Sequence, residues 1–169
     1  MALRYRYRLG QLRAALTARL TPEDRAVAAA ALSPNELRLF ECMPRRDQRH
    51  CLDVFRLLQR GGYQDPLLLR AALLHDIGKI DDDGRPIPLL YYGVFVLLKR
   101  LAPALYSWAA AHPRGPLRPF AIHAVHDQRS ARLAEAAGSP PELVATLRDY
   151  AERRITERTA ALSWADNQV

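Results

Sequence analysis

Apolar residues recur along most of this chain at intervals of three and four positions, which is the spacing of one face of an α-helix. No segment combines sustained apolar–polar alternation with β-branched side chains, the pattern of a strand. Several expected helix starts carry a capping residue followed by proline and an acid. The pattern predicts an all-α protein with helices at about 8–19, 22–31, 34–43, 47–60, 66–77, 87–101, 103–111, 119–136, 141–151 and 153–166.

The length and composition are those of one domain with its own core. The chain has 169 residues, of which 49% are hydrophobic. We expect residues 21–169 to form the helical domain and residues 1–20 to form an N-terminal arm or docking helix. The two cysteines, Cys42 and Cys51, form no Cys-x-x-Cys pair, so neither a disulfide scaffold nor a cysteine-based zinc site is expected. Free thiols, and the lack of an apolar stretch behind the basic N-terminus, favour a cytoplasmic protein without a signal peptide.

One stretch, 89–111, is long and apolar enough to be tested as a membrane span. Lys99 and Arg100 would then lie near the bilayer centre, each at a cost of about 2.5–3.5 kcal/mol. Pro103 would also break the helix. We therefore expect no transmembrane segment. The stretch is interpreted as two packed helices with an apolar face for a partner, and contact with a membrane surface is the weaker alternative.

The formal net charge of +7 raises the question of nucleic-acid binding. The arginines are spread along the chain rather than grouped in one stripe, and only Lys79 and Lys99 are lysines, which indicates a compositional bias. The alternation of Arg and Tyr at residues 4–8 either contacts a phosphate backbone and stacks on bases, or forms a solvated arm. Nucleic-acid binding is kept as a weaker alternative, which predicts an affinity that falls steeply with salt.

Residues with metal-binding chemistry occur at His75 and Asp76, near the end of an apolar helix. Neighbours on a helix lie about 100° apart, so this imidazole and this carboxylate can converge on one ion. His50 lies among apolar residues on another expected helix and can face inward, and Asp166 lies on the last one. Ordinary alternatives exist: a lone buried histidine is usually a satisfied core residue, and the two aspartates could form ion pairs with an arginine or with Lys79.

The order of these residues resembles the HD-domain superfamily of metal-dependent phosphohydrolases. The similarity covers about residues 34–169 and rests on the segments Asp47–His50, Ala71–Lys79 and Ala165–Asp166. Its most specific part is the run ALLHDIGK, residues 72–79. The resemblance implies an HD-domain helical bundle with one divalent ion (Mn, Fe, Co, Ni, Zn or Mg) held by His50, His75, Asp76 and Asp166.

The resemblance also places Lys79 beside the metal, where a cation can hold phosphate or stabilise developing negative charge. Lys79 is one of only two lysines in a chain dominated by arginine. Arg45, Arg46 and Gln48 precede His50, and they either line the approach of a phosphate group or form a solvated helix start.

The second half of the chain departs from those relatives that bind two metals. The stretch 120–138 resembles the helix that carries extra histidine ligands in them, and His126 falls at the first of these. Tyr150 stands near the place of the next, which argues for a single ion. His126 is therefore a candidate general acid, substrate contact or support for a ligand, and His123 on the same helix face is a weaker candidate. His112, in a loop, is assigned no role.

The function that the resemblance implies is hydrolysis of a phosphoester, in a nucleotide or small phosphorylated metabolite, through a metal-activated water. The leading alternative is a metal-stabilised nucleotide-binding or regulatory module without turnover, for which the apolar stretch 89–111 would be the interaction surface. A nucleic-acid binder that uses the Arg-Tyr segment is a third hypothesis. The substrate, the metal and any homo-oligomer are left open by the residues themselves.

Overall fold

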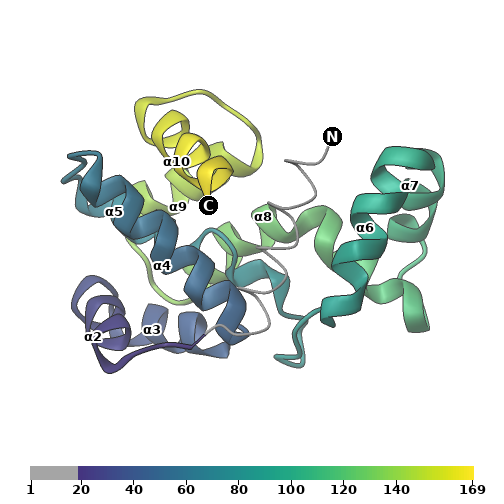
Figure 1. Cartoon of the computed structure of the whole chain (residues 1–169), viewed down its shortest axis with the longest axis horizontal. Coiled ribbons are helices and arrows are strands. Elements are labelled where there is room, and N and C mark those ends of the chain that lie inside the picture. Colours follow the sequence, from purple (N-terminus) through teal and green to yellow (C-terminus); the bar gives the residue numbers. More distant parts are fainter. Residues whose placement is uncertain (1–18) are drawn as a thin grey trace, which may run out of the picture.

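The computed structural model describes residues 19–169, and this part of the chain is helical without a β-strand (Figure 1). The all-α prediction is thereby confirmed for the described residues. The helix expected at about 8–19 and most of the arm expected at residues 1–20 lie outside them. The elements are α2 (Pro22–Ala31), α3 (Pro34–Cys42), α4 (Arg45–Arg60), α5 (Pro66–Leu74), the 3-10 turn η1 (Ile77–Lys79), α6 (Leu89–Leu101), α7 (Pro103–Ala111), the 3-10 turn η2 (Gly115–Leu117), α8 (Arg118–Ala136), α9 (Pro141–Ala151) and α10 (Glu157–Gln168).

The expected helix starts form through side-chain caps. In α2 the Thr21 hydroxyl accepts from the Asp24 N–H, and the Asp24 carboxylate accepts from the Thr21 N–H. Ser33 and Glu36 make the same reciprocal pair at the start of α3. Such pairs satisfy N–H groups that have no partner inside the helix, which explains why these boundaries match the sequence prediction.

Two clusters of buried apolar side chains hold the helices together. The larger joins α2–α5, α9, α10 and the second half of α8. The smaller joins α6, α7 and the first half of α8, and consists of Ile87, Phe95, Tyr106, Ala109 and Phe120. Helix α8 therefore belongs to both clusters. Figure 1 shows α6 and α7, hereafter the hairpin (residues 89–111), at one end of the molecule and α8 running from it to the rest.

Two helix boundaries differ from the sequence prediction by a turn. Helix α5 ends at Leu74 instead of about residue 77. Helix α10 begins at Glu157 instead of about residue 153. Arg153 has a φ of 56°, a left-handed conformation that ends α9. Thr156 then caps the new helix through its contacts with Thr159, so the chain cannot run straight from one helix into the next.

A fully buried carboxylate ties the first helices to the main core. The Glu36 side chain has no exposed surface. Its oxygens accept from Arg70 on α5 at 2.6 Å and from the Ser139 hydroxyl at 2.6 Å, in addition to the cap contact with Ser33. Burial alone would raise the pKa of Glu36, but hydrogen bonds from Ser139, Arg70 and Ser33 outweigh it and lower the pKa below its usual range.

We expect Glu36→Gln to lower the free energy of unfolding at neutral pH by about 2 kcal/mol, because charged hydrogen bonds to Arg70 and Ser139 are lost. A lowered pKa means that this stabilisation is complete above about pH 4.3, the ordinary glutamate value, and is lost as pH falls through the folded-state pKa. Urea unfolding at a series of pH values should therefore show the difference shrinking in acid. Glu135→Gln, at an exposed pair with Arg148, is the control and should change little at any pH. Equal effects of the two changes would contradict this account.

Among the described residues, no helix combines the length and apolar character needed to cross a bilayer.

Candidate metal centre

His75 and Asp76 lie at a bend between α5 and η1, not within a helix as the sequence predicted. His75 still has helical dihedral angles and closes α5, but Asp76 has φ −106° and ψ 1°. The reason is a competing contact with α8: the Ser130 hydroxyl donates to the His75 carbonyl at 2.6 Å and accepts from the Gly78 N–H at 2.9 Å. These backbone groups would have continued the helix, and their capture by Ser130 ends it.

Gly78 makes this contact sterically feasible. A Cβ atom at this position would lie 2.0 Å from the His126 carbonyl oxygen and 2.7 Å from the Ser130 nitrogen, both in the backbone of α8. Arg129 adds hydrogen bonds to the carbonyls of Gly78 and Ile80 at 3.2 and 2.9 Å. The bend and α8 are therefore in direct backbone contact, and only glycine permits that approach.

Four predicted ligands, hereafter the His/Asp cluster, come together from three parts of the chain. His50 projects from α4 and Asp166 from α10, and both reach the bend that carries His75 and Asp76. His50 Nε2 lies 2.9 Å from Asp166 Oδ1 and 3.9 Å from Asp76 Oδ2. His75 Nε2 lies 3.5 Å from Asp166 Oδ1 and 3.7 Å from Asp76 Oδ2.

These separations can be compared with those around a cation. With bonds of about 2.1 Å, adjacent ligand atoms stand about 3 Å apart and opposite ones about 4 Å in an octahedral site. The four measured separations, from 2.9 to 3.9 Å, cover this range. Ligand atoms of His50, His75 and Asp166 all lie within 4.8 Å of one another. The spacing and the N/O donor types suit one ion of the Mn, Fe, Co, Ni or Zn class.

The His75 ring provides a second test of this fit. The side chain is 2% exposed, and its Nδ1 lies 3.0 Å from the Ala72 carbonyl oxygen. In that contact the Nδ1–H donates to the carbonyl, and Nε2 faces the two carboxylates. Nε2 is buried without a hydrogen-bond partner. A buried ring nitrogen placed between carboxylates needs either its own proton or a cation there, so this position suits a metal ligand once that proton is lost.

Both aspartates of the cluster are held in the ionised form. Burial alone would raise their pKa values, but the charges of Lys79 and His75 lower the pKa of Asp76 well below its usual range. The hydrogen bond from His50 and the close approach of His75 do the same for the pKa of Asp166. Burial lowers and the Asp76 carboxylate raises the pKa of His75, and the carboxylate prevails. A divalent cation would therefore compete with protons on the imidazoles, not on the carboxylates.

Lys79 contacts a predicted ligand directly. Its ammonium donates to Asp76 Oδ2 at 2.5 Å. Burial would lower the pKa of Lys79, but Asp76 outweighs it, and the pKa is raised. The ion pair that the sequence left open as an alternative is thus present, on the same carboxylate that was predicted to bind metal. Lys79 lies at the edge of the His/Asp cluster with its charge fixed beside it.

The histidines of α8 have different environments. His126 Nε2 lies 3.7 Å from Asp76 Oδ1 and 3.0 Å from Asp127 Oδ1, so this ring reaches the edge of the His/Asp cluster. His123 instead stacks on Phe95 at 4.2 Å in the smaller core, and its pKa is lowered by burial to about 3. His123 is therefore a neutral histidine packed in the smaller core. His112, with no assigned role, is exposed at the end of α7.

Tyr150 has a contact that sequence reasoning did not anticipate. Its hydroxyl donates to Asp166 Oδ2 at 2.7 Å. Burial and the Asp166 charge raise the pKa of Tyr150, so the hydroxyl keeps its proton. Tyr150, which stands near the place of an extra histidine ligand in the two-metal relatives, therefore fixes the orientation of the predicted ligand Asp166. Its place in the sequence had been noted, but nothing there showed which carboxylate it would meet.

A polar group beside Lys79 was also missed. Asp47 is 7% exposed, and its Oδ2 has no hydrogen-bond partner. The buried hydroxyl of Tyr92 also lacks a hydrogen-bond partner. Burial raises the pKa of Asp47, against the opposing influence of Lys79. Arg46 lies over the Tyr92 ring at 4.7 Å and contacts Asp47 at 3.4 Å. Asp47 and His50 are three residues apart on one helix and so share a face, which could have indicated from the sequence that Asp47 lies near the site.

The residues ahead of His50 have three different environments. Gln48 is buried and donates to the backbone carbonyls of Met43 and Glu41, so it does not line an approach to the site. Arg45 is exposed at the start of α4. Arg46 donates to the Ile87 carbonyl at 2.7 Å. Its guanidinium and the Lys79 ammonium both lie over the ring of Tyr92, so Arg46 is the member of this group that is near Lys79.

Cys51 offers an alternative donor set. Its thiol lies 3.9 Å from His75 Nδ1, and Cys51, His75 and Asp76 form a second group with metal-binding spacing. The thiol is fully buried, and burial raises its pKa, which disfavours the thiolate that a metal requires. The Nδ1 atom is also engaged by Ala72. The set that uses Nε2 is therefore the better one.

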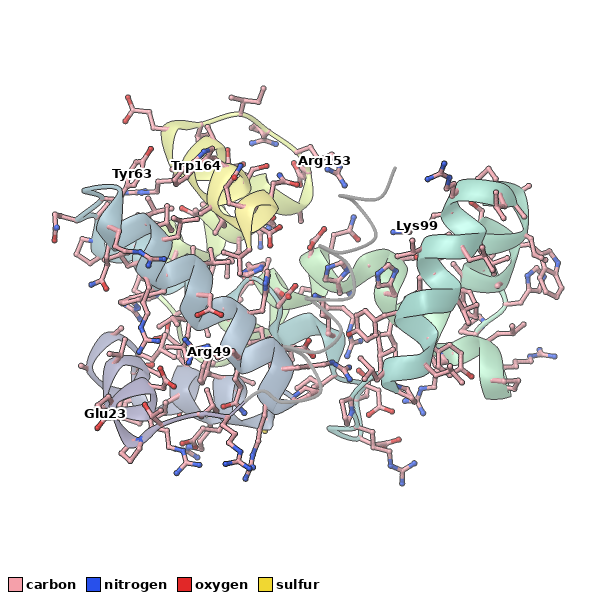
Figure 2. The ribbon with its side chains drawn as sticks, in the orientation of Figure 1. Glu23, Arg49, Tyr63, Lys99, Arg153 and Trp164 are labelled. Atoms are coloured by element: carbon pink, nitrogen blue, oxygen red, sulfur yellow. The ribbon has the colours of Figure 1, made fainter. Side chains whose placement is uncertain are left out.

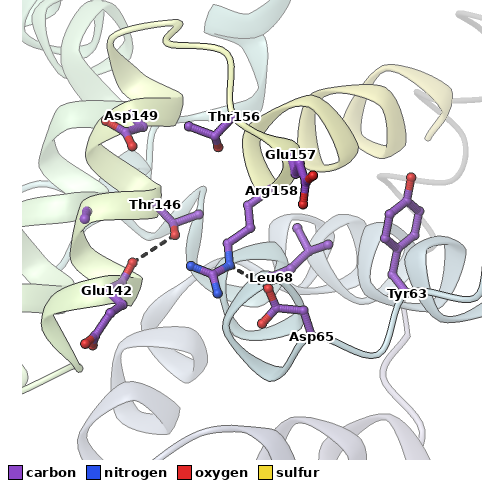
Figure 3. A pocket seen from close by; sticks show the side chains of 10 residues that line it. Tyr63, Asp65, Leu68, Glu142, Thr146, Asp149, Thr156, Glu157 and Arg158 are labelled. Atoms are coloured by element: carbon purple, nitrogen blue, oxygen red, sulfur yellow. Dashed lines mark hydrogen bonds and ion pairs between the residues drawn. The ribbon is translucent and has the colours of Figure 1, made fainter.

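A cavity of about 550 Å³ lies elsewhere, between the start of α5, α9 and the start of α10 (Figure 3). Arg158 crosses it to pair with Asp65 at 2.5 Å. None of the predicted site residues lines it. Its other charged walls are Glu142, Asp149 and Glu157.

Comparison of the chain with protein-family models, with curated proteins and with solved structures finds no match.

Proposed function

We propose that the chain is a metal-dependent phosphohydrolase of the HD-domain type, acting on a nucleotide or small phosphoester. The supporting observation is the arrangement of His50, His75, Asp76 and Asp166, whose donor atoms have the spacing of a cation's ligands. The partnerless Nε2 of buried His75 supports the same conclusion independently of the resemblance. A bound divalent cation supplies a lowered pKa for water and polarisation of a phosphoryl oxygen.

The chain's own residues have distinct tasks in this proposal. Ala72 and Tyr150 fix two of the ligands, His75 and Asp166, through single hydrogen bonds. Such contacts orient a ligand and raise its affinity for metal. Lys79 holds Asp76 and provides a fixed positive charge next to it, where negative charge develops on phosphoryl oxygens.

His126 is placed to move a proton. Its Nδ1 lies 2.8 Å from the His123 carbonyl oxygen, which fixes the ring, and its Nε2 is directed at the carboxylates of Asp76 and Asp127. Nε2 therefore lies beside the His/Asp cluster, where it can pass a proton to a leaving oxygen. No contact of this kind exists for His123, which we exclude from the reaction.

The test is phosphate release from a broad panel of nucleotides and phosphate esters. We expect the purified protein, loaded with Mn²⁺, Fe²⁺, Co²⁺, Ni²⁺ or Zn²⁺, to release phosphate from at least one of them. Chelation should abolish the release and readdition of the ion should restore it, because the proposed reaction relies on the ion to lower the pKa of water. His112→Ala, which removes an exposed histidine outside the His/Asp cluster, is the control and should change nothing.

Two results would contradict the proposal. Protein that retains the ion but releases no phosphate from any compound, while binding a nucleotide tightly, would identify a binding module without turnover. Protein that takes up no ion, with His75→Ala leaving metal content unchanged, would remove the metal centre altogether.

A further inference from the structure

The hairpin formed by α6 and α7 carries an apolar surface that faces outward. Seven of the eleven exposed large hydrophobic side chains among the described residues belong to it: Leu90, Val94, Val96, Leu97, Leu101, Leu105 and Trp108. Leu90 is 80%, Leu101 70% and Trp108 52% exposed. Contiguous exposed apolar surface of this kind marks a binding site.

The outward residues of α6 form a stripe. Leu90, Val94, Leu97 and Leu101 follow one another at intervals of four, three and four residues, which places them on one helix face. The opposite face, with Phe95, is buried against α7 and α8. The helix is therefore apolar on both sides although only one side has a partner within the described chain.

Charge identifies the kind of surface that this face would meet. No aspartate or glutamate occurs between Asp83 and Asp127, so all eighteen acids of the chain lie outside the hairpin and its flanks. The same stretch carries five cations, Arg85, Lys99, Arg100, Arg114 and Arg118, of which Arg118 pairs with Asp81 and Asp83. Arg100 and Arg114 are exposed, at the end of α6 and just after α7. An apolar face with a cationic rim and no acid is complementary to an anionic bilayer surface.

We propose that the hairpin docks on the surface of a membrane that contains anionic lipid, with its leucine stripe and Trp108 in the interfacial region. Tryptophan favours that depth because its ring is apolar and its N–H is polar. The hairpin lies in the interface and does not cross the bilayer, consistent with the lack of a spanning helix among the described residues.

A second copy of the chain is a poorer occupant. Two such faces would bring together Lys99, Arg100 and Arg114 of both copies, while residues 84–126 contain no acid to pair with them. A protein partner would have to present an acidic, apolar groove, whereas an anionic bilayer offers both properties over its whole surface. Docking would also leave the His/Asp cluster clear of the lipid, because its residues lie on α4, α10 and the bend and none belongs to the hairpin.

The two tryptophans allow a matched test. Trp108 lies on α7 of the hairpin and Trp164 on α10. In Figure 2 the labelled Trp164 and the hairpin, where Lys99 is labelled, lie at opposite sides of the molecule. With Trp164→Phe, Trp108 is the sole reporter. We expect its emission to shift to shorter wavelength on addition of vesicles of equimolar phosphatidylcholine and phosphatidylglycerol, and to be quenched by bromine on the acyl chains. The reciprocal protein, Trp108→Phe, should show neither change.

Variants separate the two contributions to binding. Leu97→Glu together with Leu101→Glu should lower the partition coefficient about a hundredfold or more, because two leucines no longer enter the interface. Arg100→Ala should lower it about fivefold, and added salt should weaken it further. Ile155→Glu changes a side chain that is 87% exposed outside the hairpin and should leave binding unchanged.

Several results would overturn the proposal. These are no binding to the anionic vesicles, equal binding to vesicles of pure phosphatidylcholine, or binding that survives the double glutamate change. A dimer in light scattering without lipid that the same double change dissociates would assign the face to a second copy instead.

Discussion

Replacing Asp166 with asparagine is expected to abolish cation binding while leaving the fold intact. The change removes the negative charge that a divalent ion requires but keeps the size of the side chain. The amide oxygen can still accept from Tyr150, and the amide N–H can donate to the lone pair on Nε2 of His50 or His75. The new hydrogen bonds thus occupy the atoms that the ion would need.

The expected magnitude is a loss of affinity for the ion of about a hundredfold or more, and a fall in metal-dependent phosphate release of about a thousandfold. Elemental analysis and calorimetric titration measure the first and a phosphate assay the second. The free energy of unfolding of the metal-free protein should change by less than about 1 kcal/mol.

Asp127→Asn is the matched control, because Asp127 is another partly exposed aspartate beside the site, but its ion pair is with His126 and not with a proposed ligand. Its metal content should equal that of the unchanged protein. If Asp166→Asn retained its metal, or if both changes lowered metal content equally, the assignment of Asp166 as a ligand would be wrong.

Gly78→Ala is expected to lower the free energy of unfolding by about 3 kcal/mol or more. The added Cβ would lie 2.0 Å from the His126 carbonyl oxygen, a backbone atom that cannot rotate aside as a flexible side chain could. Relief requires α8 to move away from the bend, which breaks the contacts of Ser130 and disturbs both apolar clusters.

Gly93→Ala provides the opposite case within the same protein. Gly93 lies in the middle of α6, and a Cβ there would meet nothing within 4 Å. Alanine is a better helix former, so this change should raise the free energy of unfolding by about 1 kcal/mol. Urea unfolding of the two variants tests both expectations. Similar effects for the two changes would show that Gly78 does not sit against α8 as described.

Sequence reasoning was most reliable where the determinants are local. The starts of α2 and α3 are set by Thr21 and Ser33, whose capping groups lie within three residues. Helix α5 ended early because Ser130, more than fifty residues away, captures two of the backbone groups that follow it. No pattern within 66–79 contains that information.

The same contrast between local and distant determinants holds for the site. The types and order of His50, His75, Asp76 and Asp166 were sufficient to suggest that they meet, and they do. The partners that hold them could not be inferred. Tyr150 reaches Asp166 only because Arg153 turns the chain back between α9 and α10.

Glu36 illustrates why some interior residues escape prediction altogether. A glutamate in the first turn of a helix is ordinarily a solvated capping group. Here it is buried, since Arg70 and Ser139 arrive from distant segments to satisfy it. A buried charge depends on its partners, and hydrophobic patterning does not report them.

The contact between His50 and Asp166 joins residues 116 positions apart in the sequence. On a ribosome, α4 and the bend emerge before α10 has been made, so the nascent chain carries three of the four proposed ligands before the last carboxylate. Under the proposed function, firm retention of a cation would require that α10 has been synthesised and has docked against α4 and the bend.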